Sequence, residues 1–101
     1  MNNNNNNKFV IVRSSNSGVH AGFLVSQQGD TVVLKNARRL WRWVVAKMTG
    51  QLSSLSEVAV YGINAKSDLS RIAVAVDEIT IIGVCEIIPT SAAAQKSIEE
   101  A

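Results

Sequence analysis

Short apolar runs, separated by clusters of serine, asparagine and glycine, make up most of the chain. The first run, residues 9–12, has no polar interruption, which predicts a strand covered on both faces. A second strand is predicted over residues 19–26, where Gly22 indicates a bulge or a sharp bend. A tight reversal at residues 27–30 leads into a third strand at residues 31–37. The second and third strands are therefore predicted to form a hairpin.

Two helices are predicted from capping signals. Ser54 is followed three residues later by Glu57, which fits a capping box at the start of a short central helix. Either Thr90 or Ser91 would cap a final helix over residues 92–99. Two glutamates stand at the C-terminal end of that helix, where the helix dipole disfavours anions, so its end is expected to fray.

The later part of the chain continues the β pattern. Residues 71–76 and 79–88 predict further strands, the second of them broken by Gly83, and Asp77 and Glu78 are interpreted as a turn between them. About six strands, one short central helix and a C-terminal helix predict a mainly β fold with minor α content. The expected architecture is a small, strongly bent antiparallel sheet or open barrel.

The length of 101 residues indicates one small domain. Residues 1–7, a methionine and six asparagines, are predicted to be a disordered tail. Residues 8–90 are predicted to form a single β-rich domain and residues 91–101 the C-terminal helix. Hydrophobic residues make up 47% of this short chain, so some apolar surface is expected to be buried between the subunits of a homo-oligomer.

The net charge, the lengths of the apolar runs and the single cysteine bear on the partners, the cellular location and the disulfide content of the protein. The formal net charge of +2 is too small to indicate nucleic-acid binding by the chain as a whole. The sequence shows neither a signal peptide nor an apolar run as long as a membrane helix, so we expect a cytoplasmic protein that does not associate with membranes. The single cysteine, Cys85, excludes an internal disulfide and is interpreted as a buried strand residue.

No pattern of catalytic residues is found. The one histidine, His20, and Cys85 lack the local signature of a nucleophile and its base. The acidic residues are scattered and not clustered as metal ligands, and no glycine-rich phosphate loop opens a helix. The sequence therefore predicts a protein that is not an enzyme, with no cofactor and no metal site.

A block of alternating arginines and large apolar residues follows the third strand and contains both tryptophans. Arginine grips phosphate with a planar fork and tryptophan stacks on bases, so this block is typical of nucleotide or single-strand binding. The alternative for the tryptophans is that they anchor the core or a subunit interface. His20, on the second strand, is interpreted as a polar edge or ligand-contacting residue. The candidate ligand-binding residues are His20, Lys35, Arg38, Arg39, Trp41, Arg42 and Trp43.

Residues 32–43, VVLKNARRLWRW, resemble a family of small uncharacterised proteins of tailed phages and prophages, as do residues 18–22, 51–55 and 85–89. The resemblance covers most of residues 8–101 and implies no activity. A weaker analogy links residues 22–24, 30–37 and 81–84 to Sm-like barrels, whose rings bind RNA. That analogy implies a bent sheet that assembles through its edges.

These observations lead to one principal hypothesis. The chain is interpreted as a phage-encoded, non-enzymatic, oligomeric binding protein in the host cytoplasm. It would act as a sponge that sequesters an anionic nucleotide signal of host defence, of the cyclic or ADP-ribose type. The alternatives are a single-stranded nucleic-acid or RNA-binding Sm-like module and a protein-inhibitor or structural phage module.

Overall fold

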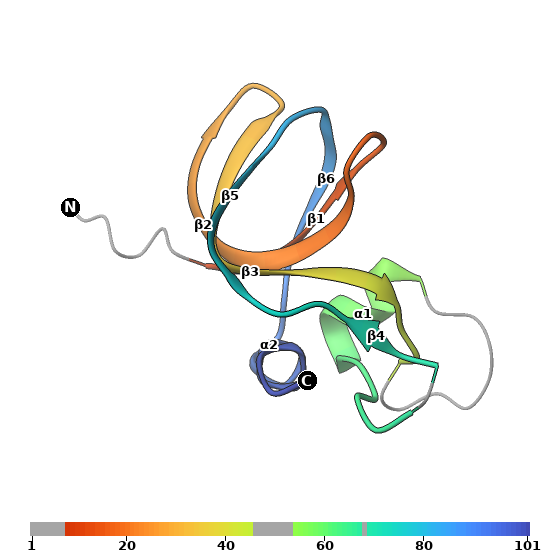
Figure 1. Cartoon of the computed structure of the whole chain (residues 1–101). Coiled ribbons are helices and arrows are strands. Elements are labelled where there is room, and N and C mark those ends of the chain that lie inside the picture. Colours follow the sequence, from red (N-terminus) through yellow and green to blue (C-terminus); the bar gives the residue numbers. More distant parts are fainter. Residues whose placement is uncertain (1–7, 46–53, 68) are drawn as a thin grey trace.

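A computed structural model describes residues 8–45, 54–67 and 69–101, so the predicted disordered tail at residues 1–7 lies outside the described part. The chain forms one antiparallel sheet with two helices on one side of it (Figure 1). In chain order the elements are β1 (Phe9–Ser14), β2 (Gly18–Gln28), β3 (Thr31–Arg42), α1 (Leu55–Tyr61), β4 (Arg71–Ile72), β5 (Val76–Ile81), β6 (Val84–Pro89) and α2 (Ala92–Glu99). The predicted mainly β fold of six strands, a short central helix and a C-terminal helix is confirmed.

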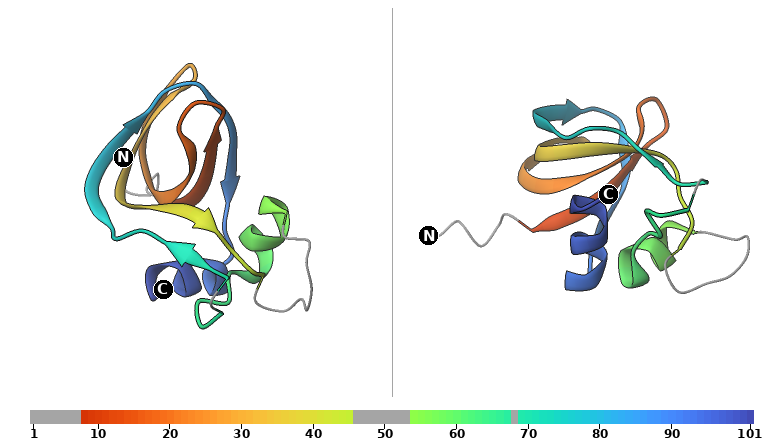
Figure 2. Two further views of the ribbon diagram at one scale, coloured as in Figure 1. Left: turned by 45° about the vertical axis from the view of Figure 1, so that its right-hand side comes forward. Right: turned by 60° about the horizontal axis from the view of Figure 1, so that its bottom comes forward.

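Strand β3 lies at the centre of the sheet. The strand order is β4-β3-β2-β1-β6, and β5 also pairs with β3, so β3 has three partners. The sheet curls strongly without closing, and β5 and β6 remain as edges of the curled part (Figure 2). The predicted hairpin of the second and third strands is present as β2 and β3.

The two faces of β1 contribute to two separate cores, as its uninterrupted apolar run predicts. Phe9 and Ile11 pack toward the helices, whereas Val10 and Val12 pack into the concave side of the sheet. The helix-side core consists of Phe9, Ile11, Ala21, Leu40, Val45, Val58, Ala59, Ile63 and Ile98. The concave-side core consists of Val10, Val12, Val32, Leu34, Ala37 and Ile81. Both faces of the sheet are therefore covered along part of its length.

A bulge in β3 bends the central hairpin at the glycine that the sequence singled out. Lys35 pairs with Phe23 but Arg38 pairs with Ala21, so Gly22 stands opposite two residues of β3. A Cβ atom on Gly22 would lie 2.9 Å from the Lys35 carbonyl oxygen, a distance at which the backbone has to move. Asn36 takes the left-handed conformation in the bulge, with φ of 50°, which asparagine tolerates better than most residues.

The helices begin where the sequence predicts. Ser54 and Glu57 form the complete capping box of α1, and Gly62 with φ of 87° ends that helix. Ser91 caps α2, its hydroxyl accepting from the backbone N–H of Ala94. Neither helix of the described part has the length and apolar character that crossing a membrane requires.

Arg38 holds the C-terminal end of α2 against the sheet. Its Nε donates to the carbonyl of Ala73 at 2.6 Å. Its Nη1 donates to three carbonyls at or just beyond the end of the helix, those of Ile98 (2.9 Å), Glu99 (3.4 Å) and Ala101 (2.7 Å). A cation at this end satisfies the unpaired carbonyls and complements the helix dipole. The expectation of a fraying end took account of the two glutamates but not of this arginine.

Three local interpretations were wrong. Asp77 and Glu78 lie within β5 and not in a turn, since both side chains of this edge strand face solvent, where carboxylates remain hydrated. The predicted strand at residues 71–76 is interrupted: Arg71–Ile72 form β4, residues 73–75 are not in a strand, and Val76 already begins β5. Cys85 is exposed and not buried, because β6 shifts its register against β1 at that position.

Replacing Arg38 by alanine is expected to lower the free energy of unfolding by about 2–3 kcal/mol. The variant removes charge-assisted hydrogen bonds to four carbonyls and the cation at the helix end. Urea denaturation followed by far-ultraviolet circular dichroism measures the difference. Lys96→Ala, on the same helix but exposed, is the control and should change stability by less than about 0.5 kcal/mol. Equal stability of Arg38→Ala and the unmodified chain would show that Arg38 does not hold α2.

Candidate functional site

The site is built on a contact between His20 of β2 and Arg39 of β3. The two residues are register partners in the antiparallel ladder. Arg39 Nε donates to His20 Nε2 at 3.2 Å, and His20 is only 2% exposed. This hydrogen bond restricts the side chain of Arg39, and it determines which nitrogen of His20 carries the proton.

His20 must be the neutral Nδ1–H tautomer in this arrangement, because Nε2 accepts the hydrogen bond from Arg39. Its Nδ1 is buried and has no hydrogen-bond partner among the described residues. A buried donor without a partner costs about 1–3 kcal/mol, and such groups are rare in native proteins. Burial, and secondarily the charge of Arg39, lowers the pKa of His20 below its ordinary value of 6.5.

The guanidinium of Arg39 also lies over an exposed tryptophan. Its Cζ is 5.1 Å from the ring centre of Trp41, within the range of a cation–π interaction. Trp41 is 58% exposed although it is among the largest apolar side chains. An aromatic side chain with this much exposed surface is characteristic of interaction sites.

A cavity of about 260 Å³ opens beside these three residues. One wall is β3, and the other is the segment between β4 and β5, which runs along β3 (Figure 1) and donates from Ala73 N–H to the Arg39 carbonyl at 2.9 Å. The lining is mainly apolar: Ala37, Ala73, Val74, Val76 and Ile79, with His20, Arg39 and Trp41. Ligand cavities commonly measure about 300–1,000 Å³, so this one accommodates a single compact group.

A second hollow, about 410 Å³ in volume, adjoins Trp41 and is lined by Trp41, Arg42 and Arg71. Arg42 and Arg71 are register partners between β3 and β4, and both are exposed. The sequence analysis did not identify Arg71. The sequence gives little indication of Arg71, because an arginine at the start of a predicted strand does not show which strand it will pair with.

The structure places the other three predicted residues elsewhere. Arg38 extends from the opposite face of β3 and contacts α2. Lys35 pairs across the ladder with Glu78 and is seven strand positions before Arg42, roughly 23 Å in an extended strand. Trp43 packs against the helix-side core, as the alternative for the tryptophans expected. His20, Arg39, Trp41 and Arg42 are thus the predicted residues that come together.

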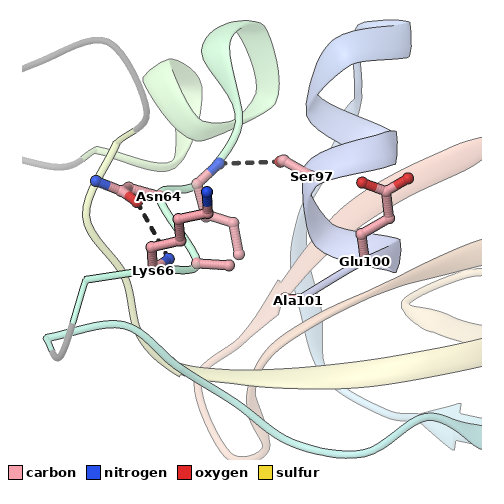
Figure 3. Close-up of a pocket in the computed structure, with 7 residues that line it drawn as sticks. Asn64, Lys66, Ser97, Glu100 and Ala101 are labelled. Atoms are coloured by element: carbon pink, nitrogen blue, oxygen red, sulfur yellow. Dashed lines mark hydrogen bonds between the residues drawn. The ribbon is translucent and has the colours of Figure 1, made fainter.

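A groove of about 560 Å³ lies beside the C-terminal ends of the two helices, between the segment after α1 and the end of α2. Figure 3 shows Asn64 and Lys66 facing Ser97 and Glu100 across it. Ser97 has a structural role there, since its hydroxyl accepts from the Ile63 N–H at 3.0 Å and joins the two helices. The groove is larger than the cavity at Trp41, but it contains neither an aromatic face nor a cluster of cations.

No group of three or more histidine, cysteine, aspartate or glutamate side chains that could hold a metal ion occurs among the described residues. The chemical resources of the site are therefore cationic donors, an aromatic face and one buried imidazole N–H. Such a set can bind and orient an anion that carries a planar ring.

The pKa of His20 provides a direct test of the buried contact. Because the folded-state pKa lies below 6.5, the unfolded chain binds the proton more readily than the folded one. Stability is then fully present above pH 6.5 and falls as the pH decreases from about 6.5 toward the folded-state pKa. Since His20 is the one histidine of the chain, its imidazole C–H signal in NMR spectra titrates alone, with an expected midpoint below 6.5.

The matching control is His20→Gln, whose unfolding free energy should vary less between pH 7.5 and 5.5 than that of the unmodified chain. An imidazole midpoint at or above 6.5 would contradict the buried, Arg39-bound state of His20.

Comparison with known proteins gives a family and no activity. No curated protein and no solved structure matches the chain significantly. One family matches residues 7–98, which include every strand and nearly all of α2. The chain therefore belongs to the family described as Domain of unknown function (DUF6948).

Proposed function

We propose that the protein is a non-enzymatic binding protein that captures a small anionic nucleotide at His20, Arg39 and Trp41. The observation that carries the proposal is the exposed Trp41 ring beneath a guanidinium that a buried histidine holds in place. A nucleotide supplies both complementary parts, a flat ring for the tryptophan and phosphate for the arginines.

The cations of this surface have no acidic partners in the described chain. Of its residues, only Arg13 and Glu86 form a salt bridge, and that pair lies elsewhere, between β1 and β6. Arg39 uses its Nε for His20, which leaves its terminal nitrogens, with four of its five N–H donors, for a ligand. The contact with His20 limits the side-chain freedom that Arg39 would lose on binding, so more of the interaction energy appears as affinity.

The biological setting forms part of the proposal. The resemblance to tailed-phage proteins favours a sponge in the host cytoplasm that sequesters a cyclic or ADP-ribose-type defence nucleotide. Tight binding without turnover is sufficient for that purpose. We propose the phage origin of the family and the analogy to Sm-like barrels on the same basis.

We further propose that the protein is a homo-oligomer. The exposed fractions of Val74 (77%) and Ile82 (63%), on or near the edge strand β5, are large for aliphatic side chains, and the sheet has open edges at β5 and β6. Native mass spectrometry gives the number of subunits and detects a nucleotide that co-purifies. A monomer over the whole micromolar range would contradict the oligomer.

A second candidate function is binding of single-stranded nucleic acid. It is favoured by the same exposed Trp41 with Arg42 and Arg71 beside it, because stacking faces with cations are how such proteins follow a strand. This function predicts affinity that rises with strand length and falls steeply with salt. A sponge would bind one nucleotide per site, with no gain from a longer strand.

Isothermal titration against cyclic dinucleotides, cyclic trinucleotides and ADP-ribose tests the proposal. One of these ligands should bind with a Kd of about 1 μM or lower. Arg39→Ala and Trp41→Ala should each weaken binding roughly tenfold or more, since each removes a charge-assisted hydrogen bond or a stacking face.

Lys35→Ala is the control, because it removes one positive charge at a position distant from Trp41 on β3. It should leave the Kd within about twofold. If no nucleotide of the panel binds, or if Lys35→Ala and Arg39→Ala weaken binding equally, the site is not at Trp41. Binding only to an acidic protein would instead support the protein-inhibitor alternative.

A further inference from the structure

Two arginines stand directly opposite each other at the end of the central strand. Arg42 of β3 and Arg71 of β4 are register partners, and together with Trp41 they line the hollow of about 410 Å³. Like charges placed opposite each other in an antiparallel ladder destabilise it. β4 has only two residues in its strand, so few ladder contacts are available to offset that cost.

No carboxylate of the described residues forms a salt bridge with either arginine. A sheet of this size offers several ways to avoid the repulsion, such as the lysine–glutamate pairing of Lys35 with Glu78 on the same strand. The Arg42–Arg71 pair instead places two positive charges beside an aromatic face. Departures of this kind from local stability rules tend to occur at functional sites.

We infer that Arg42 and Arg71 form a phosphate subsite, and that the cavity of about 260 Å³, which Trp41 also lines, takes the planar ring of the same ligand. The inference rests on the proposed function, and it divides the nucleotide site into a cavity for the ring and a subsite for phosphate. Trp41 belongs to the lining of both hollows, so a ligand in contact with its ring reaches each of them.

The residues that line the two hollows determine how the nucleotide is oriented. Five of the eight residues lining the smaller cavity are alanine, valine or isoleucine, which favours a ring and disfavours a hydrated phosphate. The larger hollow is bordered by two guanidinium groups and is open to solvent, which suits an anion. The ligand class is thus a nucleotide whose phosphates extend away from β5 toward β4, and a longer strand gains no further subsite.

The test compares three probes, ADP, adenosine and inorganic pyrophosphate, on the full chain and on Arg71→Ala. Arg71→Ala should weaken the binding of ADP and of pyrophosphate by at least about tenfold. It should leave the binding of adenosine within about twofold. The melting temperature of the ligand-free variant should be unchanged or higher, because the substitution relieves the repulsion from Arg42.

Lys66→Ala is the control of equal charge, since Lys66 lies in the groove between the helices and should leave the affinity for all three probes unchanged. The thermal shift induced by pyrophosphate provides a second measurement on the same variants.

The outcomes separate the two proposals. If ADP binds equally well to Arg71→Ala and to the unmodified chain, the phosphate subsite is wrong while nucleotide binding stands. If Arg71→Ala weakens adenosine as strongly as ADP, or lowers the melting temperature, Arg71 is structural and the inference is overturned. If none of the three probes, nor any nucleotide of the titration panel, binds to the unmodified chain, both proposals fail.

Discussion

The alternation of side chains along β3 is the constraint on which the rest of the structure depends. β3 pairs with β2, β4 and β5, so it cannot rotate to bring both of its faces to one side. Consecutive residues of a strand point to opposite faces. Arg38 therefore extends to the carbonyls at the end of α2, while Arg39 extends to His20 and Trp41. Two adjacent arginines thus have entirely different roles, one in holding the helix and one at the candidate site.

The bulge at Asn36 determines which residue takes which role. Before it, Leu34 faces the concave core, and after it Ala37 faces the same core, because one extra residue of β3 stands opposite Gly22. If the same residues alternated from Leu34 without a bulge, Arg38 would point to the concave side and Arg39 toward the helices. Gly22 permits the close approach of the two strands, and Asn36 accepts the left-handed conformation. The position of the candidate site thus depends on two residues that do not belong to it.

Most of the fold was predictable, because its signals are local. The capping box of Ser54, the cap of Ser91 and the unbroken run of β1 each encode their structure within a few residues. The contacts of the site are not local. Arg38 bonds carbonyls about 60 positions away, and Arg71 finds Arg42 only once β4 has joined the sheet. Pattern analysis located the block, but it could not show what each side of the block contacts, and it did not identify Arg71. It also misjudged Asp77 and Cys85, whose surroundings depend on which strands remain at the edges.

Three features that are unfavourable for stability lie close together at one end of the sheet. An imidazole nitrogen of His20 that is buried without a partner among the described residues, an exposed tryptophan and a facing pair of arginines lie on neighbouring positions of β2, β3 and β4. None of them contributes to either core, whereas polar groups that line the groove between the helices form hydrogen bonds with one another or with the adjoining backbone. A chain that keeps several such costs together is explained most simply if a ligand offsets them when it binds.

The most direct test of this account uses the two tryptophans. An NMR titration with ADP follows the two indole N–H signals, one from exposed Trp41 and one from Trp43, which packs on the helix-side core. Binding at the candidate site should shift the Trp41 signal progressively to saturation and leave the Trp43 signal nearly unmoved. Shifts of equal size in both signals, or a shift confined to Trp43, would contradict a binding site at the exposed Trp41.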